Sequence, residues 1–159
     1  PRNHSSAASD VYKRQAVMQD IQDQHIFIGV AAVADYRPAD LQAQKIKKSQ
    51  DEMTITMVKN PDILADVAAR DAAPFCVGFA AETNDVVAYA RGKLERKKLD
   101  LIAANHVGGE ETGFGVPDNA ITLISAKEAT LLPKQNKYAL ARQLIAEIAK
   151  HYHAKNTQS

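Results

Sequence analysis

Runs of apolar residues divide the chain into candidate strands, and helical patterns lie between them. Residues 26–34 (IFIGVAAVA) are continuously apolar and rich in β-branched side chains, which predicts a strand buried on both faces, as in a parallel sheet. Residues 75–81 (FCVGFAA) and 99–104 (LDLIAA) predict two further strands of this kind. The alternation at residues 53–57 (MTITM) predicts a half-buried strand.

Stripes of apolar side chains at helical spacing predict four helices: residues 16–24, a helix beginning near 60–62, a helix beginning near 83–85, and residues 137–150. The second of these has clear start signals. Asn60 suits the N-cap, Pro61 the first helical position, and Asp62 the positive end of the helix dipole.

The end of the chain predicts an antiparallel hairpin. Residues 120–125 and 129–132 are apolar segments separated by three residues, and the Gly- and Pro-rich residues 106–119 before them predict a long loop. Strands that alternate with helices indicate an α/β fold. We therefore expect a three-layer Rossmann-like domain with a mainly parallel sheet and an edge hairpin.

Both termini differ in composition from the predicted domain, which we place at residues 16–150. Residues 1–15 show neither helical nor strand periodicity, which predicts a disordered or non-native leader; a short ordered arm is the alternative. Residues 151–159 predict a polar tail that frays.

Composition excludes several function classes. The chain has 159 residues and a formal net charge of +1, which fits one domain and argues against nucleic-acid binding through bulk charge. No run reaches the ~18 apolar residues of a membrane span. The single cysteine, Cys76, excludes an intrachain disulfide and a cysteine zinc site. Without a secretory signal pattern, we expect a cytoplasmic protein.

Familiar catalytic motifs are absent from the sequence. It contains no dinucleotide, P-loop, nucleophile-elbow or HExxH fingerprint. Cys76 lies in an apolar strand pattern, which predicts a buried, unreactive thiol. His151 and His153 lie in the predicted tail and indicate an exposed polar end rather than a metal site.

Polar residues gather where the predicted strands end, and cations cluster nearby. Asp35, Glu82, Asn84 and Asn105 occupy strand ends, where α/β folds bind ligands. Asp35 alone is compatible with binding a hydroxyl group or a metal, or with a solvated loop.

The cations fall into two groups. Residues 45–48 read KIKK, and Lys93 and Lys97 share a helix face with Arg96 and Lys98 beside them. Like charges four residues apart repel, so the pattern indicates either an anionic ligand between them or a solvated basic face.

Four ordered strings resemble one family: residues 31–38 (AAVADYRP), 45–48 (KIKK), 57–64 (MVKNPDIL) and 77–83 (VGFAAET). Together they make residues 26–150 similar to phosphopantothenoylcysteine synthetase, also called phosphopantothenate–cysteine ligase. In bacteria this is usually the C-terminal half of a bifunctional coenzyme A biosynthesis flavoprotein, whose other half is a decarboxylase that binds FMN.

The resemblance implies a two-step ligation with CTP and Mg²⁺. CTP would activate the carboxylate of 4′-phosphopantothenate as an acyl-cytidylate and release pyrophosphate. The amine of cysteine would then form 4′-phosphopantothenoylcysteine and release CMP. The resemblance also implies a homodimer, and FMN is not implied for this chain.

The resemblance carries site roles to individual positions. Lys45 matches a lysine that binds CTP and serves the chemistry. The other positions match nucleotide-binding residues of the family: Gly29, Val30, Ala31, Asp35, Pro61, Asp62, Ile63, Leu64, Phe79, Lys93 and Lys97.

The N-terminal residues depart from the family pattern. The family's domain begins with a strand, a Gly-containing loop and a helix, which the sequence before Ile26 does not show. Residues 3–6 (NHSS) are similar to an active-site string of the family, but Ala7 replaces its glycine. A catalytically incomplete nucleotide-binding fragment is therefore the alternative to an active ligase. Because the dinucleotide fingerprint is absent, a nucleotide-dependent oxidoreductase is disfavoured.

Overall fold

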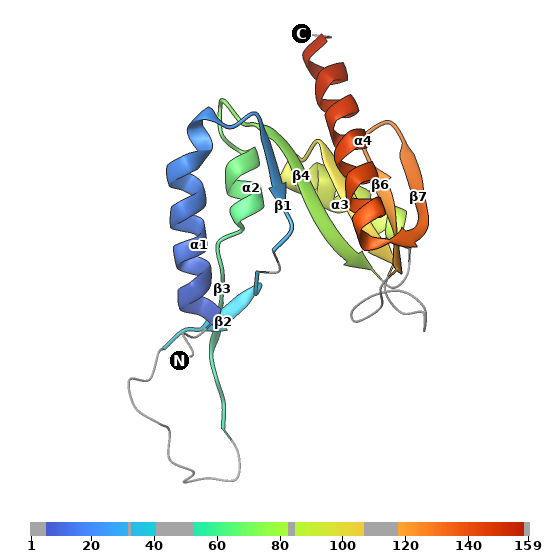
Figure 1. The fold of residues 1–159 in the computed structure, drawn as a ribbon. Coiled ribbons are helices and arrows are strands. Elements are labelled where there is room, and N and C mark those ends of the chain that lie inside the picture. Colours follow the sequence, from blue (N-terminus) through green and yellow to red (C-terminus); the bar gives the residue numbers. More distant parts are fainter. Residues whose placement is uncertain (1–5, 32, 41–52, 83–84, 107–117, 158–159) are drawn as a thin grey trace.

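A five-stranded sheet organises the chain. The computed structural model describes residues 6–31, 33–40, 53–82, 85–106 and 118–157. The strand order is β1-β4-β5-β6-β7 (Figure 1). The strands are β1 (Ile26–Gly29), β4 (Phe75–Glu82), β5 (Leu101–His106), β6 (Asp118–Ile124) and β7 (Ala129–Asn136). β1, β4 and β5 are parallel, and β6 and β7 form an antiparallel hairpin at one edge, which confirms the predicted α/β fold.

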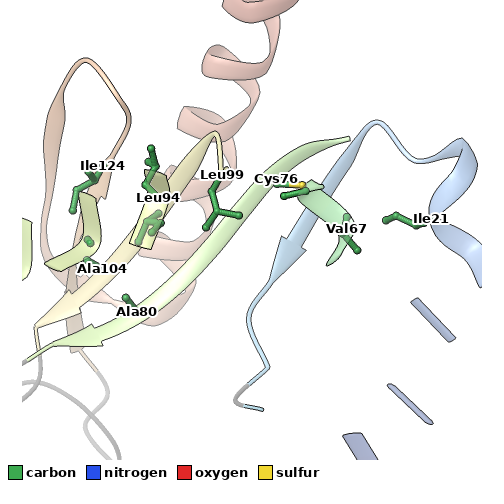
Figure 2. Packing of buried hydrophobic residues seen from close by; sticks show 11 residues of the cluster. Ile21, Val67, Cys76, Ala80, Leu94, Leu99, Ala104 and Ile124 are labelled. Carbon is green, nitrogen blue, oxygen red and sulfur yellow. The ribbon is translucent and has the colours of Figure 1, made fainter. Parts of the chain in front are cut away.

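Helices cover both faces of this sheet in three layers. They are α1 (Ser6–Asp20) with a 3-10 turn η1 (Ile21–Asp23), α2 (Ile63–Ala68), α3 (Val86–Lys97) and α4 (Lys137–Thr157). Val67 of α2 and Leu94 of α3 bury against one face with Cys76 of β4 (Figure 2). Leu144 of α4 buries against the other face with Val77. Because side chains alternate along β4, neighbouring residues serve opposite cores.

The predicted leader is wrong for residues 6–15, which form most of α1. This helix is attached to the rest of the fold mainly by polar contacts, because it has no long apolar stripe. Arg14 Nε donates to Asp66 Oδ2 of α2 at 2.7 Å, and Lys13 Nζ donates to Asp10 Oδ1 at 2.9 Å. Val17 adds an apolar contact with the core. Since Arg14 finds Asp66 only in the tertiary fold, hydrophobic periodicity could not indicate this contact.

The predicted fraying tail is also wrong, because α4 continues to Thr157. The ring of Tyr152 packs edge-on against Phe75, with centroids 5.9 Å apart. Lys155 Nζ pairs with Asp100 Oδ1 at 2.6 Å and lies 5.8 Å from the Phe75 ring centroid. These contacts fasten the last turns of α4 to the end of the sheet where β4 begins.

Two predicted strands are shorter or shifted. β1 ends at Gly29, and the apolar residues after it leave the sheet, with Val30 60% exposed. The predicted strand at 53–57 is instead β3 (Met57–Lys59), which pairs antiparallel with β2 (Tyr36–Pro38). This two-stranded ribbon lies apart from the main sheet, near the N-terminal end of α1 (Figure 1).

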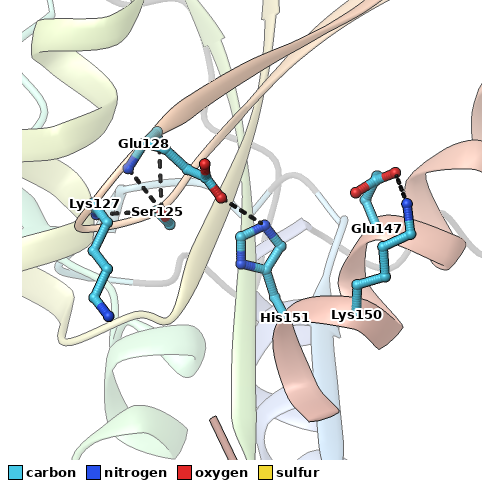
Figure 3. A network of polar contacts seen from close by, with 6 residues as sticks. All are labelled: Ser125, Lys127, Glu128, Glu147, Lys150 and His151. Atoms are coloured by element: carbon cyan, nitrogen blue, oxygen red, sulfur yellow. Dashed lines mark hydrogen bonds and ion pairs between the residues drawn. The ribbon is translucent and has the colours of Figure 1, made fainter. Parts of the chain in front are cut away.

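The hairpin turn between β6 and β7 is closed by local polar contacts. Ser125 Oγ accepts from the backbone N–H groups of Lys127 at 3.3 Å and Glu128 at 3.0 Å (Figure 3). Glu128 Oε1 lies 3.7 Å from His151 Nε2 of α4. The predicted loop at 106–119 falls largely outside the described residues.

Candidate functional site

A pocket of about 470 Å³ lies at the carboxyl ends of β1 and β4. Its walls come from the segment that follows β1, from the loop that leads into α2, and from α1 and α3. This is the edge at which parallel α/β sheets bind ligands, because neighbouring strands diverge there into loops. The pocket is therefore placed by topology where a ligand is expected.

The structure brings eleven of the twelve resemblance-derived site residues to this pocket. They are Gly29, Val30, Ala31, Asp35, Pro61, Asp62, Ile63, Leu64, Phe79, Lys93 and Lys97. The twelfth, Lys45, lies outside the described residues, as do its KIKK neighbours and Asn84. Positions up to 68 residues apart in sequence thus line one cavity, which neither periodicity nor spacing could predict.

Sequence reasoning missed three polar residues of the pocket wall: Lys13, Lys59 and Asn60 as a lining residue. Lys59 directly precedes the predicted helix start, so its neighbourhood was a usable signal. Lys13 lies in the segment assigned to the leader, and no sequence pattern indicated its position.

Charge in the pocket favours an anionic ligand. Lys13, Lys59, Lys93 and Lys97 line it, against the carboxylates of Asp35 and Asp62. Lys13 pairs with Asp10 outside the lining and Lys97 pairs with Asp62, but the lining residues themselves include four lysines and two carboxylates, a positive excess on a surface partly shielded from water, where charges interact more strongly than in bulk solvent. A phosphate-bearing molecule has the charge that this surface lacks.

Asp62 is the most constrained of these charged groups. Its Oδ1 accepts from the Ala65 backbone N–H at 3.1 Å, and its Oδ2 lies 2.8 Å from Lys97 Nζ. Partial burial raises the pKa of Asp62, but the Lys97 hydrogen bond, the Ala65 N–H and the charges of Lys97 and Lys59 outweigh it. The pKa therefore lies below its ordinary value.

The cap of α2 differs from the prediction. Asp62 is the N-cap and Ile63 begins the helix, so the predicted N-cap, Asn60, lies two residues earlier. Asn60 instead makes tertiary contacts: its Nδ2 donates to the Ala34 carbonyl at 2.6 Å, and its Oδ1 accepts from Arg37 Nη1 at 2.9 Å. A buried amide with partners on both sides stabilises the local structure more than a solvent-exposed cap.

Two glycines let Leu64, which lines the pocket, lie close to the sheet. Gly29 of β1 and Gly78 of β4 lie opposite each other in the parallel register. A Cβ at Gly29 would lie 3.3 Å from Leu64 Cδ1, and one at Gly78 would lie 2.9 Å from Leu64 Cδ2. The absence of side chains at both positions lets Leu64 of α2 sit low over the sheet, which leaves space above it.

Other predicted residues divide between core and strand ends. Cys76 is buried, its Sγ donates to the Pro74 carbonyl at 3.3 Å, and burial raises the pKa of its thiol to about 11, as expected for an unreactive cysteine. At the end of β5, the buried Oδ1 of Asn105 has no hydrogen-bond partner among the described residues. Asn105 is close to the predicted ligand edge but does not line the pocket.

The side chains at the pocket suit a metal ion only if the ligand shares in binding it. The described residues contain no group of three or more His, Cys, Asp or Glu side chains that could hold a metal alone. Magnesium commonly binds through one or two carboxylates and the phosphates of its substrate. Asp35, whose side chain is exposed at the pocket, has the donor chemistry for that arrangement.

Comparison with known proteins adds the family. The profile described as "DNA/pantothenate metabolism flavoprotein C-terminal domain" matches residues 4–152. The chain belongs to this family. The match includes residues that the sequence analysis had assigned to the leader, in agreement with their place in α1.

Curated relatives of this flavoprotein C-terminal domain are coenzyme A biosynthesis proteins. It is 53% identical over 150 residues to "Coenzyme A biosynthesis bifunctional protein CoaBC" of Vibrio vulnificus (strain YJ016), covering 92% of this chain and 37% of the relative. The Escherichia coli (strain K12) protein of that name is 51% identical over 145 residues, covering 89% of this chain and 36% of the relative. The chain thus spans a little over a third of these relatives.

Solved structures agree on the fold. The crystal structure of the C-terminal domain of CoaBC aligns with a TM-score of 0.68 and 29% identity, covering 94% of this chain and 63% of that one. The DNA/pantothenate metabolism flavoprotein from Streptococcus pneumoniae aligns with a TM-score of 0.69, covering 94% and 72%, and its 19% identity supports the fold alone. Among the described residues, no helix is both long and apolar enough to cross a membrane.

Proposed function

We propose that this chain carries the CTP-binding site of a phosphopantothenate–cysteine ligase and ligates 4′-phosphopantothenate with cysteine in coenzyme A biosynthesis. The observation that carries the proposal is the convergence of eleven resemblance-derived positions on one lysine-rich pocket. Family membership and the relatives' role in coenzyme A biosynthesis support it.

The reaction forms and breaks two pairs of bonds. A carboxylate oxygen of 4′-phosphopantothenate attacks the α-phosphorus of CTP, the bond to pyrophosphate breaks, and an acyl-cytidylate results. The cysteine amine then attacks the acyl carbon, CMP leaves with the bonding electrons, and the amine loses a proton. Both leaving groups are phosphate anions, so neutralising their charge lowers both barriers.

The pocket's residues suit these steps. Lys59, Lys93 and Lys97 would neutralise the phosphates, and Phe79 and Val30 would supply apolar contact for the nucleoside. Lys45 would add a further cation from the segment outside the described residues. Mg²⁺ held by Asp35 and the phosphates would withdraw charge from the phosphate oxygens. We place the reaction in the cytoplasm, where cysteine remains reduced.

Pyrophosphate release tests the proposal. The chain is incubated with Mg²⁺, CTP and 4′-phosphopantothenate, with and without cysteine, and with ATP as the nucleotide control. Release that requires 4′-phosphopantothenate, prefers CTP and yields the cysteine adduct by mass would support the ligase. CTP binding without release would favour the alternative, a catalytically incomplete nucleotide-binding fragment. Neither binding nor release would refute both.

A homodimer is the partner that we propose, formed through the β2–β3 ribbon. Tyr36 and Met57 share one face of the ribbon and are 58% and 48% exposed, and the preceding Ile55 and Met53 are 52% and 63% exposed. Contiguous exposed apolar side chains of this kind mark protein interfaces. Sedimentation should show a dimer for the wild type and a monomer for Ile55→Ser/Met57→Ser. A wild-type monomer at high micromolar concentration would contradict the proposal.

A further inference from the structure

One buried amide joins the two segments that carry the pocket's carboxylates. Asn60 is 7% exposed, and both polar atoms of its side chain have protein partners. Its Nδ2 donates to the Ala34 carbonyl at 2.6 Å, its Oδ1 accepts from Arg37 Nη1 at 2.9 Å, and its backbone N–H donates to the Asp35 carbonyl at 2.8 Å. Arg37 Nη1 also donates to the Lys59 carbonyl at 3.1 Å.

These hydrogen bonds connect two segments that lie outside the strands and therefore have no sheet hydrogen bonds between them. β1 ends at Gly29, so Ala34 and Asp35 lie outside any strand, and the loop at Asn60–Asp62 lies between β3 and α2. Both segments line the pocket. Asn60 therefore fixes the segment that carries Asp35 against the loop whose Asp62 pairs with Lys97.

We propose that Asn60, braced by Arg37, is a positioning residue for the nucleotide pocket. It holds the Asp35 segment and the Asp62 loop at the separation that the nucleotide requires, and acts through these neighbours rather than on the reacting atoms. This inference rests on the proposed CTP-binding function.

Removing either residue of the clamp, which we define as Asn60 and Arg37, should change the geometry of nucleotide binding. Without the Asn60 amide, the Ala34 carbonyl and the Arg37 guanidinium lose their partner, so the Asp35 segment and the Asp62 loop are held together less firmly. Because the clamp sets where the nucleotide sits, we expect the larger effect in KM.

The experiment compares Asn60→Ala, Arg37→Ala and the double variant with a matched control, Asp100→Asn. Asp100 also joins two elements through a partly buried polar side chain, accepting from Cys76 N at 2.8 Å and from Lys155 Nζ at 2.6 Å, but it does not line the pocket. CTP affinity is measured by calorimetry, KM and kcat by pyrophosphate release, and stability by thermal unfolding.

We expect Asn60→Ala to raise the Kd and KM for CTP at least tenfold while kcat changes less than threefold. Arg37→Ala should raise both in the same direction, and the double variant should lose less than the product of the single losses, because the two residues act as one unit. Asp100→Asn should lower Tm and leave both constants within twofold of wild type. If Asn60→Ala does not fold, Arg37→Ala is compared with the control Asp100→Asn instead.

Two outcomes overturn the proposal: clamp variants that lower Tm like the control but leave the CTP constants unchanged, or single losses that multiply in the double variant. A ligand-free measurement separates this failure from failure of the proposed function. In NMR spectra of the free protein, the carboxyl carbons of Asp35 and Asp62 should shift in Asn60→Ala and Arg37→Ala but not in Asp100→Asn. If wild type binds no CTP, the proposed function fails, and these shifts alone decide whether the clamp positions the pocket.

Discussion

A single methyl group added at Gly78 tests whether Leu64 needs this glycine to lie close to the sheet. In Gly78→Ala the new Cβ would lie 2.9 Å from Leu64 Cδ2 and 3.0 Å from Leu99 Cδ1. Both separations are shorter than ordinary van der Waals contact, so the ends of the Leu64 and Leu99 side chains must shift. We expect Leu64 to rise into the pocket.

The magnitude follows from the crowding. Inserting a methyl group into a packed core typically costs ~1–3 kcal/mol. For a domain of this size, each kcal/mol lowers Tm by ~2–4 °C, so we expect a drop of roughly 2–12 °C. CTP affinity should fall as well, because the displaced side chain occupies the volume intended for the ligand.

Two variants make the test specific. Gly92→Ala is the same chemical change in α3, where nothing lies within 4 Å of the new Cβ, and it should stabilise the protein by ~0.5–1 kcal/mol. Leu64→Val in the Gly78→Ala background should recover part of the lost Tm, because it shortens the side chain that clashes. Thermal unfolding and calorimetry supply the data. A Gly78→Ala protein as stable as Gly92→Ala, or one that Leu64→Val only weakens further, would refute the reasoning.

Three further predictions concern charge and reactivity. The pKa of Asp62 lies below its ordinary 3.8, so the ionised carboxylate stabilises the fold above pH 3.8 and this contribution is lost as the pH falls through the lower folded pKa. In a plot of Tm against pH, Asp62→Asn should therefore show a smaller drop on the acid side than wild type. Lys155→Ala removes the ion pair with Asp100 and should lower Tm, measured by thermal unfolding, by roughly 1–4 °C. The side chain of Lys150 is 69% exposed, so Lys150→Ala should leave Tm unchanged. Cys76, with a thiol pKa of about 11 and a buried position, should react with a thiol reagent at pH 8 only after denaturant is added; rapid labelling of native protein would contradict this.

The pattern of apolar residues was sufficient to predict the strands and helices that form mainly because their side chains are buried. The strands containing Cys76 and Leu101 and the helix with Leu144 were predicted because each buries a run or stripe in one of the two cores. Hydrophobic burial is encoded locally as periodicity, so it is visible in a single sequence.

Polar tertiary contacts explain most of the errors. In the helix at residues 6–15, Arg14 pairs with Asp66, and in the last turns of α4, Lys155 pairs with Asp100. Each pair joins residues more than fifty positions apart, at separations of 52 and 55. Nothing near either residue in sequence indicates its partner, so the predicted leader and tail were assigned by their polar composition alone.

The charges of the pocket are more balanced than the lysine pair in the sequence indicates. The helical spacing of Lys93 and Lys97 is compatible with an anionic ligand between them or with a solvated basic face, and the structure places the carboxylate of Asp62 2.8 Å from Lys97. That carboxylate offsets part of the repulsion among the four lysines that line this cavity. What remains to favour a phosphate ligand is the excess of lysines over carboxylates, not the pair alone. In the proposed complex, a bound polyphosphate would have to compete with Asp62 for Lys97, so this ion pair would limit how tightly the pocket could hold a nucleotide.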